Sequence, residues 1–302
     1  MAISRAQLAK ELEPGLNALF GMSYDSYERE YEDIFVIEDS NRAFEEEVLV
    51  TGFGSAPLKS EGQGVQFDNA SESFTSRYTH DTIALAFALT EEAVEDNLYD
   101  SLGKRYVKAL AKSMANTKEV KGADVLNNAF SSSFTGGDGV SLINTAHPLS
   151  GGGTAANRAT TMADLNEASL EDALIDISTF TDDRGLTISV QADKLVVPPQ
   201  LVFVADRLLN SPGRVGTSDN DINAINNTGM LPEGYVVNNY LTDTDAYFIK
   251  TDCPDGFKYF ERSPMSTSLE GDFDTGNMRY KARERYSFGY SNFRAVYGSQ
   301  GA

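Results

Sequence analysis

A helical repeat of apolar residues at positions 90–121 is the feature that most constrains how this chain can fold. Thr90 is a favourable N-cap residue, and Gly122 follows the last turn as a stop signal. At 1.5 Å per residue the stretch spans roughly 48 Å, close to the ~50 Å diameter expected for a compact chain of this length. The sequence therefore predicts one helix that crosses the whole molecule, and it favours a flat, elongated subunit.

A row of positive charge follows the face of this helix opposite its broad apolar arc. Lys104, Lys108 and Lys112 recur every fourth residue, in a chain whose formal net charge is −20. Two interpretations stay open. The row is either an ordinary solvated helix face or a docking row for acidic segments of a neighbouring subunit.

The totals exclude several classes of protein. With 302 residues and 41% hydrophobic content, the chain can bury a substantial core in one large domain or two smaller ones. The chain has 45 acidic and 25 basic residues. This excess of acidic residues argues against binding of a nucleic-acid backbone by the chain as a whole. The single cysteine, Cys253, excludes an intramolecular disulfide framework and indicates synthesis in a reducing cytoplasm. A signal peptide and a membrane span are not expected.

The first ninety residues predict parts that cannot be stable alone. An amphipathic helix interrupted at Pro14 is predicted for residues 4–19, and aromatic residues at helical spacing stud the acidic segment 24–35. That segment has too few aliphatic residues to fold alone, so we expect it to lie on another surface. Residues 48–54 and 79–89 predict the two strands of a long hairpin with a glycine-rich tip. Since an isolated hairpin is marginal in water, it needs a partner surface, which we expect on another chain.

The second half of the chain alternates helices and strands. We predict a helix at 165–180, a buried strand interrupted by two prolines at 194–205, the start of a short helix at 207–211, and an ordered Asn- and Asp-rich loop at 217–228. The inward-facing residues of the predicted helix are Leu170, Leu174 and Ile177.

The last fifty residues show the most regular pattern. Residues 257–262 can pair with 278–290, and the even positions of the second strand are mostly apolar or aromatic. Its odd positions carry four cations: Arg279, Lys281, Arg283 and Arg285. A row of positive charges is unfavourable unless nearby carboxylates form ion pairs with it. The candidate carboxylates are Asp272, Asp274, Glu261 and the acidic segment of a neighbour.

The sequence gives little support for a catalytic site. The only two histidines, His80 and His147, are far apart in the sequence and outside any HExxH pattern, which argues against a zinc hydrolase. His147 has no G-x-S-x-G serine and no acid placed to orient it, so a structural role is favoured. We expect no catalytic residue, no cofactor and no metal site. A soluble acidic hydrolase built around His147 stays as a distant alternative.

Four blocks of sequence carry a resemblance to a known family: residues 145–149 (TAHPL), 197–201 (VPPQL), 220–223 (NDIN) and 273–289. Along its whole length the chain resembles the major capsid proteins of tailed bacteriophages with the Hong Kong 97 fold. The likeness is greatest to the major head subunits of Mu-like phages and prophages. It implies an α+β fold with an N-terminal arm (1–45), an extended loop (46–88), the spine helix with the first part of a peripheral domain (89–135), an axial domain (136–255) and the C-terminal hairpin of the peripheral domain (256–302).

The resemblance also implies a function. Subunits of that family assemble into hexamers and pentamers of an icosahedral shell that encloses double-stranded DNA without sequence-specific binding. The implied partners are other copies of the chain, a scaffolding protein, a portal and cement or decoration proteins. The implied location is the virion, after assembly in the bacterial host cytoplasm. The candidate subunit-interface residues are Lys59, Lys104, Lys108, Lys112, Arg279, Lys281, Arg283 and Arg285, the last four near three-fold positions.

Two family variations stay open. An encapsulin-like shell has the same fold and encloses a cargo enzyme instead of DNA. Some capsid proteins also cross-link covalently through a lysine on the extended loop and an asparagine on a neighbour, and Lys59 and Asn277 match that pattern in residue type and region only.

Overall fold

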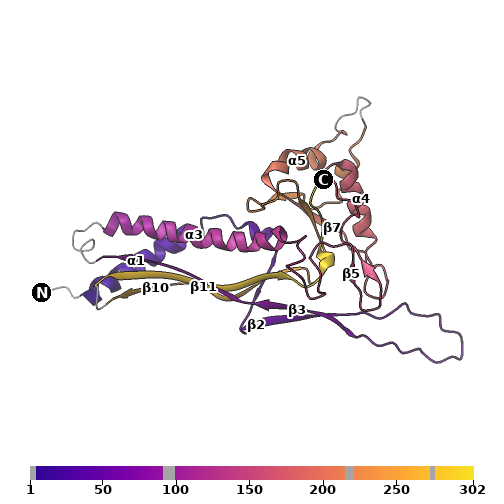
Figure 1. The fold of residues 1–302 in the computed structure, drawn as a ribbon, viewed down its shortest axis with the longest axis horizontal. Helices are drawn as coiled ribbons and strands as arrows, with labels where there is room; N and C mark the ends of the chain where they lie inside the picture. The colour runs from indigo at the N-terminus through magenta and orange to yellow at the C-terminus, as the bar shows by residue number, and fades with distance from the viewer. Residues whose placement is uncertain (1–4, 91–98, 215–220, 273–275) are drawn as a thin grey trace.

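A computed structural model describes residues 5–90, 99–214, 221–272 and 276–302 of this chain. The molecule is elongated, as the long helical repeat predicts (Figure 1). Two helices and two long strands form the long part of the molecule, which we call the arm and which is distinct from the N-terminal arm at 1–45. They are α1 (Arg5–Tyr24), α3 (Tyr99–Asn127), β10 (Phe257–Gly271) and β11 (Met278–Tyr290). A lobe at one end of the arm carries the C-terminus, and a long loop projects past this lobe.

The arm is built on a four-stranded sheet in the order β1-β10-β11-β4. β1 (Val36–Asp39) runs parallel to β10, and β11 is antiparallel to both β10 and β4 (Asp81–Leu89). Helices α1 and α3 cover one face of the sheet. The apolar side chains that fill this contact are Phe20, Val107, Leu110, Ala111, Met114, Tyr280 and Ala282. The predicted alternation of β11 is confirmed, because its even positions from 280 to 286 are buried and its odd positions from 279 to 283 are exposed.

The long helix ends later than the sequence predicts. α3 runs to Asn127, so the predicted end at residue 121 is wrong, while the predicted first turn, 91–98, lies outside the described residues. Gly122 is not a stop signal but an internal position, where an added Cβ would come within 3.2 Å of Tyr31. The helix continues because Ala123 and Leu126 extend its buried face.

The N-terminal segment also differs from the prediction. α1 continues through Pro14 to Tyr24, so the predicted interruption and the end at residue 19 are wrong. The aromatic residues that follow do not form one helix, because a short 3₁₀ helix, η1 (Glu30–Asp33), leads into β1. The rings of Tyr31 and Phe35 are buried against Phe288 of β11. The segment therefore lies on a surface, as expected, and this surface belongs to the same chain.

The lobe contains a second four-stranded sheet, in the order β12-β9-β7-β8. Its strands are β7 (Ala192–Val197), β8 (Tyr235–Val237), β9 (Tyr247–Thr251) and β12 (Val296–Ser299). Helix α4 (Glu167–Ser178) begins after Asn166, whose side chain accepts a hydrogen bond from the Ser169 N–H. It buries the three residues that the sequence predicts, Leu170, Leu174 and Ile177.

Two other predictions in the lobe are wrong. The strand predicted for 194–205 ends at Val197, because the two prolines that follow cannot extend a hydrogen-bonded ladder. The short 3₁₀ helix η2 (Pro199–Leu201) and helix α5 (Val202–Asn210) take over, so this helix begins before residue 207. Part of the predicted loop 217–228 forms helix α6 (Ala224–Thr228), in which Ile225 is buried, and residues 215–220 lie outside the described part.

The long hairpin consists of different strands than predicted. β2 (Phe44–Val50) pairs with β3 (Glu72–Thr79), and residues 51–71 form the loop between them. The predicted returning strand, 79–89, is β4, which pairs with β11 of the arm instead. Local alternation indicates a strand but not its partner, which here lies far along the chain. The remaining short elements are β5 (His147–Pro148), β6 (Thr154–Ala155) and η3 (Phe293–Ala295).

Candidate functional site

The loop 51–71 exposes four large apolar side chains. Leu58 is 101% and Phe67 97% exposed, and Phe53 and Val65 are 60% and 70% exposed. Clustered exposed apolar residues on a soluble subunit mark a surface that another molecule covers. Figure 1 shows the loop projecting away from the arm and past the lobe.

Polar contacts tie the base of this loop to the lobe. The Arg184 guanidinium donates a hydrogen bond to Asp68 Oδ1 at 3.1 Å. The Ser73 hydroxyl donates to Asp183 Oδ2 at 2.8 Å, and the buried Arg294 donates to the other oxygen of the same carboxylate at 3.0 Å. Burial alone would raise the pKa of Asp183, but the hydrogen bonds from Ser73 and Arg294 lower it below its ordinary value. These charged contacts fix the direction in which the loop leaves the body.

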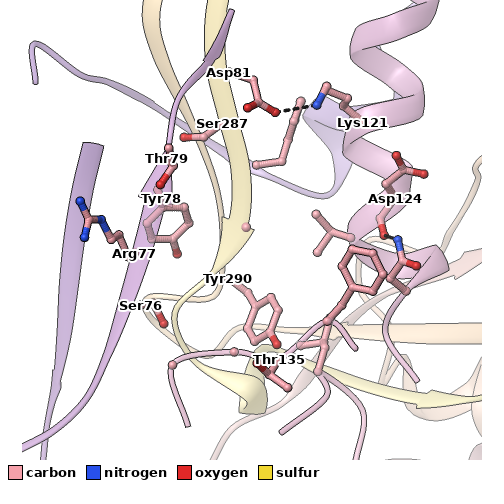
Figure 2. A pocket seen from close by; sticks show the side chains of 18 of the residues that line it. Ser76, Arg77, Tyr78, Thr79, Asp81, Lys121, Asp124, Thr135, Ser287 and Tyr290 are labelled. Carbon is pink, nitrogen blue, oxygen red and sulfur yellow. Dashed lines mark hydrogen bonds and ion pairs between the residues drawn. The ribbon is translucent and has the colours of Figure 1, made fainter. Parts of the chain in front are cut away.

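A groove of about 710 Å³ opens where the arm, the lobe and the hairpin meet. Figure 2 shows its walls, with β3 on one side and the end of α3 on the other. Lys121 of α3 forms an ion pair with Asp81 at 2.6 Å, and a Cβ added at Gly136 would lie 2.7 Å from the hydroxyl oxygen of Tyr290 of β11. Within the described residues the Tyr290 hydroxyl is buried without a hydrogen-bond partner. The groove therefore marks a junction between three parts of the fold, with charges of both signs in its lining.

The imidazole of His147 is part of the lobe's core. It is 0% exposed, and its ring stacks on Phe293 with centroids 3.8 Å apart. An acid is placed beside it, contrary to the sequence prediction, since Asp138 Oδ2 lies 2.5 Å from Nδ1. Asn157 accepts the hydrogen bond from Nε2 and uses its amide group to cross-link three backbone carbonyls. The ring is closed off from solvent, which favours the structural role that the sequence predicts over a hydrolase site.

Other reactive groups give no sign of chemistry within the described residues. No cluster of His, Cys, Asp or Glu there has the arrangement of a metal site. Burial raises the pKa of the Cys253 thiol to about 11, which keeps it protonated and unreactive. No helix in the described ranges is both long enough and apolar enough to span a bilayer.

Comparison with known families decides what the chain is. The family model described as "Phage capsid protein" matches residues 72–299, which is about three quarters of the sequence. The chain belongs to this family. It is therefore a structural protein, a capsid subunit of the virion that acts as part of an oligomer. A comparison with curated proteins gave no match.

Solved structures place this capsid protein in the Hong Kong 97 fold, as its sequence blocks imply. The capsid of Myoviridae phage XM1 is similar with a TM-score of 0.55 at 12% identity, covering 90% of each chain. The capsid of a native GTA particle also scores 0.55 at 12% identity, covering 91% of this chain and 90% of the other. A virus-like particle from Pyrococcus furiosus scores 0.51 at 10% identity, covering 94% and 97%. At these identities the likeness concerns the fold.

The predicted interface residues of this capsid protein lie on three separate surfaces. Lys59 is exposed in the loop 51–71. Lys104, Lys108 and Lys112 are exposed on α3, in the helix layer of the arm. Arg279, Lys281, Arg283 and the half-buried Arg285 lie on the opposite face of the sheet. Of the predicted carboxylate partners, Asp272 pairs with Arg279, and Asp274 lies outside the described residues.

Sequence reasoning missed a buried polar cluster between α1, α3 and β11. Glu284 sits on the helix-covered face of β11 and is 1% exposed. It forms an ion pair with Lys118 of α3, and the Tyr24 hydroxyl donates a hydrogen bond to it at 3.2 Å. Burial raises the pKa of Glu284, which the neighbouring Lys118 opposes. The sequence did contain a signal for this cluster, because Glu284 is an acidic residue at an even position of a strand whose other even positions are mostly apolar or aromatic.

Proposed function

We propose that this capsid protein assembles into pentamers and hexamers that tile an icosahedral shell around double-stranded DNA. The observation that carries the proposal is the loop 51–71, whose exposed Leu58 and Phe67 are not covered by any described part of their own chain. A shell in which each subunit covers its neighbour's loop would bury these side chains. The acidic balance of the chain supports a lumen that does not hold its DNA tightly.

The proposal includes the division of the subunit. Residues 1–45 would be the N-terminal arm, 46–88 the extended loop, 89–135 together with 256–302 the peripheral domain, and 136–255 the axial domain. Two strands cross these boundaries: β4, most of which lies in 46–88, pairs with β11 of the peripheral domain, and β12, which lies in 256–302, pairs with β9 of the axial domain. Within this division we propose two contact surfaces besides the loop. They are the α3 row (Lys104, Lys108, Lys112) and the β11 row (Arg279, Lys281, Arg283, Arg285), and Lys59 belongs to the loop contact.

Further partners follow from the same function. We propose a scaffolding protein and a portal as assembly partners, cement or decoration proteins on the outer surface, and assembly in the cytoplasm of a bacterial host. A relation to the Mu-like head subunits rests on the sequence blocks already described.

The second candidate is the one that the sequence leaves open, a nanocompartment shell with the same fold. The family match favours the phage capsid instead. The contents of purified particles separate the two, since a capsid encloses DNA and a nanocompartment encloses protein cargo.

Loop variants test the proposal. We expect Leu58→Ser with Phe67→Ser to leave the subunit folded and to prevent shell formation, because both side chains are exposed in the subunit and buried only by assembly. Phe203→Ser is the matched control, since Phe203 is 75% exposed on α5. Yields of particles are compared by sedimentation and electron microscopy. Normal shells from the loop variant would contradict the proposed role of the loop.

A further inference from the structure

The face of the arm's sheet opposite the helices has an unusual composition. Between positions 279 and 283 the odd residues of β11, Arg279, Lys281 and Arg283, are exposed, and Arg285 continues the row half-buried. Alternate residues of a strand are separated by about 7 Å, so the four cations extend over about 20 Å. Their positions on the face away from α1 and α3 follow from the burial of the intervening residues under those helices.

Small side chains flank Lys281 and Arg283 on both sides. On β4, Ala86 lies opposite Lys281 and Ala84 opposite Arg283. On β10, Ser268 lies opposite Lys281 and Ser266 opposite Arg283. We call this surface, formed by Lys281, Arg283 and Arg285 with Ala84, Ala86, Ser266 and Ser268, the basic sheet face. Because only small side chains stand opposite Lys281 and Arg283, a flat partner can approach these two cations closely.

The register neighbours of Lys281, Arg283 and Arg285 on β4 and β10 include no carboxylate, whereas Glu270 of β10 lies opposite Arg279 at the end of the row. Within the described ranges Arg279, at the end of the row, pairs with Asp272, but Lys281, Arg283 and Arg285 form no ion pair. The Nε atom of Arg285 is buried without a hydrogen-bond partner among the residues that the structure describes, as is that of Arg262 in the adjacent strand β10. An unmatched row of like charges on neighbouring strand positions is unfavourable in an isolated subunit.

Two lysines elsewhere in this chain each contact more than one acidic side chain. Lys258 contacts the carboxylates of Glu38, Glu47 and Asp255. Lys194 pairs with two more. With 45 acidic residues against 25 basic ones, carboxylates are abundant. Within the described residues no carboxylate pairs with the three successive cations Lys281, Arg283 and Arg285. This indicates that the carboxylates that neutralise them belong to another molecule.

We propose that the basic sheet face binds an acidic surface of a second copy of this chain. The proposal rests on the proposed shell function and adds the chemistry of one subunit contact. Charge complementarity selects the partner, because every copy carries a formal charge of −20 and so offers a surplus of carboxylates. In this contact the basic sheet face of one subunit meets an acidic surface of the next. The charges therefore attract the two subunits and also fix how they are oriented relative to each other.

Zero-length cross-linking tests the proposal directly. Equal amounts of unlabelled and heavy-nitrogen-labelled chain are assembled together and treated with a carbodiimide, which joins amines to carboxylates in contact. We expect Lys281 to be recovered by mass spectrometry in mixed-isotope peptides with an Asp or Glu. Cross-links at other lysines without any intermolecular product at Lys281 would overturn the proposal.

Charge reversal supplies the second readout. Arg283→Glu is compared with Arg207→Glu, which makes the same change of charge at an exposed position of α5 outside the face. We expect the first variant to lower the yield of particles about tenfold or more, since like charges brought together cost several kcal/mol. The control assembles as the natural chain does. Equal yields from the two variants would contradict the proposed contact.

Two further outcomes are distinguishable. If the natural chain forms no particles or capsomers at all, the shell function itself fails, whatever the variants do. If the natural chain binds a duplex DNA fragment, Arg283→Glu abolishes that binding, and assembly without DNA is unaffected by the variant, then the partner is a nucleic acid and the proposal is wrong.

Discussion

Lys118 Nζ lies 2.7 Å from Glu284 Oε2, and the two side chains are 7% and 1% exposed. This ion pair joins the spine helix to the central strand of the arm across a sequence separation of 166 residues. The ammonium group also lies 5.1 Å from the ring centroid of Tyr286 and 5.5 Å from that of Tyr24. The pair therefore has aromatic as well as electrostatic support in the core of the arm.

Removing one partner of this pair should destabilise the subunit strongly. Lys118→Met leaves the Glu284 carboxylate buried and unpaired, so we expect a loss of about 3 kcal/mol or more in the free energy of unfolding. The double variant Lys118→Met with Glu284→Leu should recover most of that loss. Lys121→Met is the control, because its partner Asp81 is 59% exposed and the loss should stay below about 1 kcal/mol. Urea denaturation measures all three; equal losses at the two lysines would contradict the account.

Glu119 predicts a pH dependence of stability. Burial raises the pKa of Glu119 from 4.5 to about 7, although the Tyr31 N–H donates a hydrogen bond to it. A carboxyl group with a raised pKa binds a proton more tightly in the folded than in the unfolded state. Its contribution to stability is therefore present at low pH and is lost as the pH rises from 4.5 to about 7.

Glu119→Gln should remove that dependence, because the neutral amide can still accept the Tyr31 hydrogen bond. We expect the free energy of unfolding of the variant to exceed that of the natural chain by about 3 kcal/mol at about pH 8 and to match it at the acid end of the window. Denaturant unfolding of the unassembled subunit at several pH values measures this. If the free energy of unfolding changed by the same amount in the natural chain and in the variant between about pH 5 and about pH 8, Glu119 would not be the group responsible.

Gly137 predicts a link between the lobe and the hairpin. An added Cβ there would lie 2.7 Å from the Thr75 carbonyl oxygen of β3, where the backbone cannot give way without shifting the strand. Gly137→Ala should push β3 outward and increase amide hydrogen exchange in both β2 and β3. Gly64→Ala, whose Cβ would meet nothing within 4 Å, is the control. Unchanged exchange in the Gly137 variant would show that the contact does not position the hairpin.

The family and the main elements could be predicted from the sequence because their signals are local or carried by contiguous blocks. The repeat around Leu110 and Met114 indicates a helix wherever it packs, and the alternation from Tyr280 to Tyr286 indicates a strand with one covered face. The block at 273–289 carries most of the family resemblance. Each of these signals is read without knowing what lies opposite.

The partners of those elements could not be predicted in the same way. β4 alternates as a hairpin strand would, yet it pairs with β11, and nothing in residues 81–89 distinguishes the two partners. Lys118 lies within the long helical repeat, and only the folded arm brings it to Glu284. Gly122 reads as a stop signal for the same reason, because its close approach to Tyr31 depends on an element far away in the sequence.

Sedimentation with negative-stain imaging of the natural chain tests the central claim most directly. The account predicts particles tens of nanometres across, or capsomers of about five or six copies of the 32.9 kDa chain, because the loop 51–71 needs a neighbour to cover it. A stable monomer or dimer that does not assemble even when a scaffolding protein is co-expressed would contradict it.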